Sequence, residues 1–200
     1  MRTERRMTID EIAERLALPR TTINHWVRGI SIERTPRQAA AQKRAAEGTA
    51  RRAREAREAA YAMGAQQYLA LRTEPTFRDF LCLYIGEGSK RNRNRVEICN
   101  SDPTILVVAT RWLRKLTDRP LTFGLQYHAD QDPEELRRFW AAQLDVDDPA
   151  RIKLQRKSNS NQLSGRAWRS RYGVLAVGVN DTLFRARLQA WMDAIRLEWT

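Results

Sequence analysis

Apolar residues recur at helical spacing close to the N-terminus of the chain. Ile9, Ile12 and Leu16 fall three or four residues apart, which places their side chains on one face of a helix. Thr8 stands directly before them in a position to cap this helix, and Glu11, three residues later, completes the capping-box pattern. The pattern predicts an amphipathic helix that begins after Thr8.

A second short helix is predicted directly after the first. Residues 17–19 break the first helix, because proline does not continue one. We expect Ile23, Trp26 and Val27 to face inward and to pack across the first helix. The outward positions carry side chains that can donate hydrogen bonds to phosphates and to base edges, namely Arg20, Thr21, Thr22, Asn24, His25 and Arg28.

Residues 36–72 have a different composition, dominated by Ala, Arg, Glu and Gln. These are strong helix formers, and Gly48 and Gly64 are the only expected weak points of the helix. Several Glu–Arg pairs fall at neighbouring helical positions, so part of the charge is compensated within the helix. The sequence therefore predicts an N-terminal domain at 1–34, a basic helical connector at 35–74 and a larger domain at 75–200.

Aromatic and β-branched residues return after Pro75, and strands alternate with helices up to the end of the chain. The run 77–88, FRDFLCLYIGEG, is apolar on most sides, as in a helix packed tightly against a partner. Asp-Pro pairs open two later helices, because Asp is a good N-cap and Pro suits the first turn. The predicted α+β domain has a helix at 77–88, a β-hairpin through 96–99, helices from Asp102 and Asp132, strands at 121–128 and 172–179, and a closing helix at about 181–195 with the apolar stripe Leu183, Phe184, Leu188, Trp191, Met192 and Ile195.

The charge of the chain points to a polyanionic partner. Its 36 Lys and Arg residues exceed the 24 Asp and Glu residues by 12, and the sequence pI is about 10.6. Double-stranded DNA is the first candidate and an anionic membrane surface the second. No stretch approaches the roughly 20 apolar residues of a membrane span, and the N-terminus has no apolar signal core. Cys82 and Cys99 lie in apolar runs and are expected to be buried thiols in a reducing compartment, so we predict a cytoplasmic, nucleoid-associated protein.

The connector has three interpretations that the sequence does not separate. It is a solvated helical spacer, or a helix that follows the DNA backbone with its arginines, which would make binding more sensitive to salt. Alternatively, its alanines form a seam that pairs with another helix.

The N-terminal segment resembles the helix-turn-helix of resolvases and of many bacterial regulators. The resemblance rests on the order "EIA, two polar residues, Leu, a short turn, then a polar helix with an Ile and a Trp". It implies that the second helix reads the major groove. The alternative is a helical hairpin that only caps the larger domain.

The larger domain resembles the LAGLIDADG homing-endonuclease fold, an αββαββα arrangement in which a motif helix ends in an acidic residue and a glycine. Here FLCLYIGEG would be the motif helix, and residues 132–171 a helical and basic insertion. The segment is similar to a bacterial group with a LYIGEGSK-type motif behind a helix-turn-helix. Sporulation regulators of the WhiA type pair the same two modules in the opposite order and lack cleavage.

The resemblance implies a metal-binding role for Glu87, but the motif departs from the family at two positions. Ile85 stands where the motif has its first Asp, and Cys82 replaces a packing glycine. With one motif copy, cleavage would require a homodimer, since two acids must hold the divalent metal ions. The residue that polarises water has three candidates, Gln126, Lys153 and Gln155. Alternatively, Glu87 is structural and bonds backbone amides, Lys90 or Arg91.

The resemblance also implies that the sheet lies in the major groove. Arg and Asn residues alternate on the predicted first hairpin and mix phosphate contact with base readout, namely Lys90, Arg91, Asn92, Arg93 and Arg95. The basic insertion adds Lys153, Arg156, Lys157, Arg166, Arg169 and Arg171.

Three functions follow from these features. The first is a sequence-specific, double-stranded DNA-binding transcriptional regulator, monomeric or homodimeric, with two DNA-reading modules and no cofactor. The second is a divalent-metal-dependent homing-type endonuclease that acts as a dimer and uses Mg²⁺ at Glu87. The third is an accessory protein of DNA inversion or transposition.

Overall fold

The computed structural model describes residues 1–5, 7–30, 36–157 and 170–200. It is a mixed α+β structure, as predicted, and it divides into two compact units, Met1–Arg52 and Ala53–Thr200. The division falls within the predicted connector. Within the described ranges, no helix combines the length and the apolar character that a membrane-spanning segment requires.

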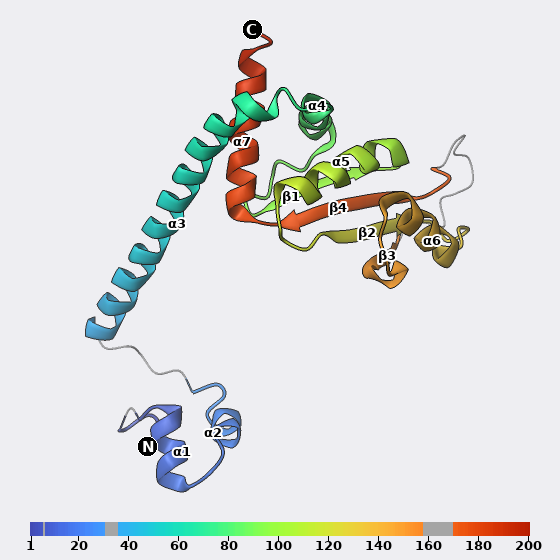
Figure 1. The fold of residues 1–200 in the computed structure, drawn as a ribbon. Helices are drawn as coiled ribbons and strands as arrows, with labels where there is room; N and C mark the ends of the chain where they lie inside the picture. Colours follow the sequence, from blue (N-terminus) through green and yellow to red (C-terminus); the bar gives the residue numbers. More distant parts are fainter. Residues whose placement is uncertain (6, 31–35, 158–169) are drawn as a thin grey trace. The chain divides into compact units, whose positions relative to one another are not determined.

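The smaller unit, unit 1, begins with the two predicted short helices, α1 (Ile9–Leu16) and α2 (Arg20–Trp26) (Figure 1). The capping box is confirmed: the Glu11 amide donates to Thr8 Oγ1 over 3.1 Å, and the Thr8 amide donates to the Glu11 carboxylate over 2.6 Å. This bond to the Thr8 amide lowers the pKa of Glu11. Ala17 ends α1 in the left-handed conformation, with φ of 52°, and turns the chain into α2.

The helices α1 and α2 contact each other, and each contributes one buried residue, Ile12 and Ile23. The expectation that Trp26 also faces inward is wrong, because 60% of its surface is exposed. Two short helices can bury only the side of each helix that faces the other. Trp26 is the last residue of α2 and lies outside this buried side, so its ring remains exposed. Val27 is half-buried.

One continuous helix, α3 (Pro36–Leu71), forms the connector and crosses both of its glycines. Gly64 is buried against α7 (Thr182–Leu197), the closing helix. A Cβ atom at this position would lie 2.8 Å from the Arg187 Cα atom and from its carbonyl oxygen. The indole of Trp191 donates to the Gly64 carbonyl over 2.8 Å. Gly64 is therefore a close-contact point between two helices rather than a weak point of one.

The end of α3 is fixed to the end of α7 by a cluster of charges. The Tyr68 hydroxyl donates to Glu198 over 2.9 Å, and Arg72 and Arg78 form ion pairs with the same carboxylate at 3.4 and 3.0 Å. Burial and this bond raise the pKa of Tyr68 to about 12. The same bond and the two arginines lower the pKa of Glu198.

The larger unit, unit 2, contains a four-stranded sheet in the order β1-β4-β2-β3. Its strands are β1 (Arg95–Asn100), β2 (Thr122–Tyr127), β3 (Ile152–Arg156) and β4 (Val174–Asn180). The strands β1 and β2 both pair antiparallel with β4, whereas β3 pairs parallel with β2. The predicted strands at 121–128 and 172–179 are confirmed as β2 and β4.

The predicted αββ start of this domain is not formed. One strand, β1, follows α4 (Phe77–Glu87), and Gly88 contributes only an isolated bridge to Ile98. The chain at Ser89 contacts both elements: its amide donates to the Glu97 carbonyl of β1 over 2.8 Å, and its carbonyl accepts from the Tyr84 hydroxyl of α4 over 2.7 Å. The pairing with β1 ends there, so no first strand of a hairpin is formed.

The insertion between β2 and β4 adds the fourth strand. It contains α6 (Pro133–Leu144), the short 3-10 helix η1 (Pro149–Arg151) and then β3. The strand was not predicted, although Ile152 and Leu154 alternate with Lys153 and Gln155, which is the period of a half-exposed strand.

Figure 1 shows α5 (Pro103–Leu116) along one face of the sheet with α4 beyond it, and the buried side chains of α4, α5, α6 and α7 form one core with those of the strands. The helices from Asp102, Asp132 and Asp181 begin as predicted, with each carboxylate accepting from amides of the first turn. The stripe of α7 is buried except at Leu183, of which 47% is exposed. Cys82 is exposed rather than buried, because the buried side of α4 comprises Phe77, Phe80, Leu81 and Tyr84 and leaves Cys82 opposite.

Candidate nucleic-acid interface

The α2 helix presents most of the predicted donors to solvent. Thr21, Asn24, His25 and Arg28 are exposed, and Thr22 is half-buried beside Ile23. Ile23 is the buried residue of α2, so Thr21, Asn24 and His25 share its outer side, and Arg28 follows just after the end of the helix. Asparagine and arginine are the residue types that bind base edges in a bidentate way.

Arg20 is exposed but has an ionic partner. Its Nε lies 3.1 Å from Asp10 Oδ1, and both side chains are about 70% exposed (70% and 68%). An ion pair this exposed contributes little to stability and is readily exchanged for another anion. Arg20 thus links the start of α2 to α1 through an exposed ion pair.

The residues of the predicted hairpin, 89–94, form an irregular segment between α4 and β1. Lys90 donates to the carbonyls of Ile85 and Gly86 and so caps the C-terminal end of α4. Asn92 accepts from the Asn94 amide over 2.8 Å, and the Asn94 side chain accepts from the Thr182 hydroxyl at the start of α7. This leaves the exposed side chains of Arg91 and Arg93 on a loop rather than in a row on the sheet.

Of the residues predicted on the first hairpin, only Arg95 lies on a strand, and its side chain bonds to residues of three strands. Its Nε donates to Glu97 over 2.8 Å, Nη1 to Asn180 over 3.0 Å and Nη2 to the Thr122 hydroxyl over 2.9 Å. The guanidinium lies across β4 at Gly178, where a Cβ atom would come within 2.9 Å of it. Arg95 therefore ties three strands together and has its charge matched by Glu97.

On the other face of the sheet, most of the alternate strand residues are half-buried or exposed in the described structure. We call this face the open face, and its residues are Arg95, Glu97, Cys99, Thr122, Gly124, Gln126, Lys153 and Gln155, together with Val174, Ala176, Gly178 and Asn180 of the central strand β4, of which Gly178 is buried. Gly124 pairs with Lys153, and Gln126 pairs with Gln155, so the three predicted water-polarising candidates lie together. Burial raises the pKa of Cys99, and the charge of Glu97 adds to this rise.

The other predicted cations of the insertion flank the open face. Lys153 and Arg156 are exposed on β3, and Lys157 directly follows, with its amide bonded to the Tyr127 carbonyl over 2.9 Å. Arg171 lies 5.3 Å from the ring of Tyr172, which stacks on Phe139. Arg166 and Arg169 lie outside the described residues.

Glu87, the last residue of α4, is exposed. None of the predicted structural partners bonds the Glu87 carboxylate in the described part of the chain. Lys90 donates to carbonyl oxygens instead, and no hydrogen bond to Glu87 comes from Arg91 or from a backbone amide. Nor do the described residues contain a group of three acidic, His or Cys side chains placed to hold a metal ion.

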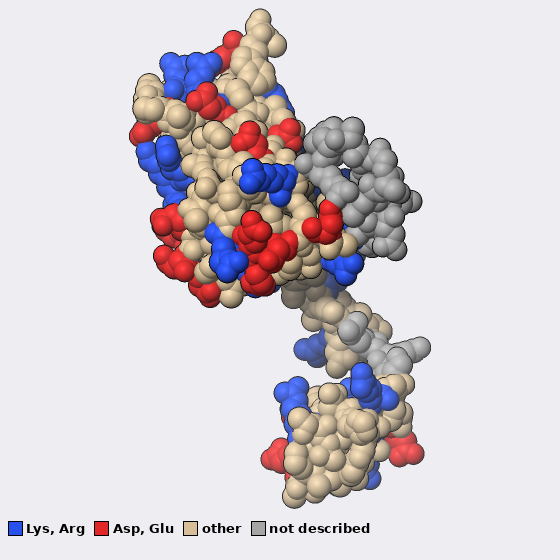
Figure 2. Space-filling model, turned by 90° about the vertical axis from the view of Figure 1, so that its right-hand side faces the viewer, with Lys and Arg blue, Asp and Glu red and all other residues tan. Residues whose placement is uncertain are grey.

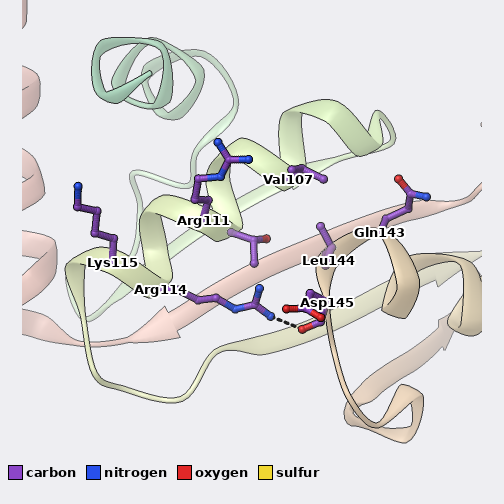
Figure 3. Close-up of a pocket in the computed structure, with 8 residues that line it drawn as sticks. Val107, Arg111, Arg114, Lys115, Gln143, Leu144 and Asp145 are labelled. Atoms are coloured by element: carbon purple, nitrogen blue, oxygen red, sulfur yellow. Dashed lines mark hydrogen bonds between the residues drawn. The ribbon is translucent and has the colours of Figure 1, made fainter. Parts of the chain in front are cut away.

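A hollow of about 570 Å³ lies between α5 and α6 and is lined by Arg111, Arg114 and Lys115. Figure 3 shows Arg114 reaching across to Asp145, whose carbonyl accepts its hydrogen bond over 2.7 Å, whereas Lys115 projects away. Lys115 forms an ion pair with Glu74 at 2.9 Å. Arg114 and Lys115 thus connect α5 to neighbouring elements, so the cations of this hollow serve mainly to hold the structure together.

Acidic and basic side chains are mixed at the α6 end of unit 2. Figure 2 shows red patches between the blue ones on this side of the larger unit. The exposed acids of α6 and of the loop after it are Asp132, Glu134, Glu135, Asp145, Asp147 and Asp148. A surface with so many carboxylates repels a polyanion, so the α6 end is less suited to binding one than the open face or the 89–94 segment.

Comparison with protein-family models, with curated proteins and with solved structures gives no match to this chain.

Proposed function

We propose that the protein is a sequence-specific, double-stranded DNA-binding regulator with two DNA-reading modules. The observation that carries this proposal is the outer side of α2. There a capped two-helix unit, with Ile12 and Ile23 buried, presents Thr21, Asn24 and His25 to solvent, and Arg28 is exposed just after the end of α2. Donors held in this way on a rigid element suit base readout, and the net charge of +12 supplies long-range attraction to DNA.

The second module is the open face with its flanking cations. Lys153 projects from the edge strand β3 on the open face, with Gln126 and Gln155 beside it as neutral donors, and Arg156 is exposed at the end of the same strand. Edge-strand cations of this kind suit phosphate contact, and neutral amides suit base edges. Two modules on one chain raise each other's effective concentration, so a monomer could bind an extended, asymmetric site.

We further propose that unit 2 is a divergent relative of the LAGLIDADG fold. The helix ending in Glu87 and Gly88, the antiparallel strands that follow and the closing helix support this. Its element order departs from the family by the missing first strand and by the added strand β3.

Selection from a pool of random-sequence duplexes by the full chain tests the proposed function. We expect enrichment of one motif, and an affinity that falls steeply with salt, by roughly 10³-fold or more between about 50 and 200 mM if some six phosphates are neutralised. An Asn24→Ala, Arg28→Ala variant should fail to enrich the motif, whereas the control Arg138→Gln on α6 should enrich it. A pool that stays random with the wild-type chain would contradict sequence-specific binding.

The alternative function is DNA cleavage, and it is favoured by one observation, the exposed carboxylate of Glu87 without a described partner. The described residues of one chain do not fit a divalent metal ion by themselves, so a second copy would have to supply further ligands. The selected duplex, incubated with Mg²⁺ and then separated on a gel, should remain intact under our proposal. Cutting that disappears with Glu87→Gln, but not with Glu135→Gln, would establish the nuclease instead.

A further inference from the structure

A second hollow in unit 2, the cationic cleft, lies between the C-terminal half of α3, the 89–94 segment and the start of α7. It has a volume of about 530 Å³. Its described lining includes four cations, Arg57, Lys90, Arg93 and Arg185, and one carboxylate, Glu58. Glu58 also lies 4.0 Å from Arg54, outside the cleft. The cleft therefore carries a surplus of positive charge.

Arg185 is unusual because it is a buried cation with an unpaired donor. Only 7% of the residue is exposed, and its Nε makes no hydrogen bond with the described residues. Its Nη1 donates to a neutral group, Gln189 Oε1, over 3.1 Å. Burying a charged group without an opposite charge is strongly unfavourable.

The hollow between α5 and α6 also has a buried unpaired atom, Thr110 Oγ1, but a neutral hydroxyl costs far less to bury.

The guanidinium of Arg185 is held in place by a chain of hydrogen bonds along α7. Gln189 accepts from Arg185 and donates to Asp193 Oδ1 over 2.9 Å, and Asp193 Oδ2 accepts from the Tyr61 hydroxyl of α3 over 3.1 Å. These contacts fix its orientation without neutralising it at close range. Burial raises the pKa of Tyr84, and the nearby charge of Arg185 opposes that rise.

We propose that the cationic cleft binds a phosphate group, which pairs with the buried Arg185 and with Arg57 and Arg93 around it. A planar guanidinium donates two parallel hydrogen bonds to a tetrahedral oxyanion, and several arginines together suit a doubly charged group. The volume leaves room for more than the phosphate itself. The phosphate can belong to a free molecule or to a DNA backbone, and the chemistry of recognition is the same. The inference does not rest on base reading by α2.

Thermal unfolding of the full chain in sodium phosphate, against sodium chloride at equal ionic strength, tests the free-phosphate source. We expect phosphate to raise the unfolding temperature of the wild type, because a ligand bound only by the folded state stabilises it. The rise should vanish in Arg185→Met and shrink in Arg93→Gln, which is exposed and should fold normally. It should persist in Arg138→Gln, a matched loss of one charge on α6. In chloride, Arg185→Met should unfold at the wild-type temperature or above, since it removes an unpaired buried donor.

A second experiment tests the DNA-backbone source of the phosphate by measuring the binding of a duplex that lacks terminal phosphates. If phosphate has no effect but Arg185→Met and Arg93→Gln each weaken duplex binding roughly tenfold, with Arg138→Gln unchanged, the cleft binds a backbone phosphate. If neither ligand distinguishes the two cleft variants from the wild type, the proposal is overturned. A phosphate effect without any duplex binding would support the cleft and contradict DNA binding, so the two proposals fail separately. Should Arg185→Met not fold, Arg93→Gln and Arg57→Gln give the same comparison.

Discussion

Replacing Gly64 with leucine is expected to lower the unfolding temperature of unit 2 by roughly 4–24 °C, which corresponds to a loss of about 2–6 kcal/mol. A Cβ atom there would meet the Arg187 backbone at 2.8 Å and the Ala190 Cβ at 3.1 Å, and backbone cannot move aside as a flexible side chain does. Overpacking of this kind costs about 1–3 kcal/mol. Separation of the helices would also strain the bond from the Trp191 indole, and a buried donor left unpaired costs about 1–3 kcal/mol more. Each kcal/mol shifts the midpoint by about 2–4 °C at this chain length.

Gly48 offers a matched control on the same helix. A Cβ atom there would touch only the flexible side chain of Arg52, at an ordinary 3.6 Å. Gly48→Leu should therefore gain helix propensity, up to about 1 kcal/mol, with no packing cost. Circular dichroism melts of the two variants should shift in opposite directions. Equal shifts would mean that α3 does not pack closely on α7 at Gly64.

The two glycines show which parts of this fold could be predicted from the sequence. Helix starts depend on residues a few positions apart, so Thr8 with Glu11 and Asp102 with Pro103 were recognised correctly. The role of Gly64 depends on α7, which is more than a hundred residues away, and in the sequence it resembles Gly48. Local chemistry is visible in a sequence, whereas close approach between distant elements is not.

The candidate site shows the same limit. The residue types of α2 could be assigned to its outer side from their spacing, but the exposure of Trp26 depends on how little of unit 1 covers it. Arg95 was predicted as a DNA contact because it stands among arginines, yet strand register places it between Glu97, Thr122 and Asn180. Arg185 was not predicted as a site residue, because in the sequence it only stands beside an apolar stripe, and the elements that line the cationic cleft with it are distant in the chain.

On a duplex selected by the wild type, variants of α2 and of β3 should fail in different ways. Asn24→Ala and Arg28→Ala should each cost about 1–3 kcal/mol, or roughly 5- to 150-fold in affinity, and should relax the preference at one or two base pairs. Lys153→Ala and Arg156→Ala each remove an exposed charge that we expect to contact phosphates rather than bases. These variants should therefore weaken binding to all DNA sequences equally. Each lost phosphate contact should also reduce the slope of log affinity against log salt by about 0.9.

Binding of the selected duplex and of single-base-pair substitutions of it, measured at several salt concentrations, separates these outcomes. The control Arg138→Gln should change neither the base preference nor the slope, since it removes a charge from the acid-rich α6 end. If the α2 variants reduce affinity evenly across all substituted duplexes and reduce the salt slope, then α2 contacts only phosphates. Sequence preference would then have to come from the open face, where Gln126 and Gln155 are the neutral donors that could supply it.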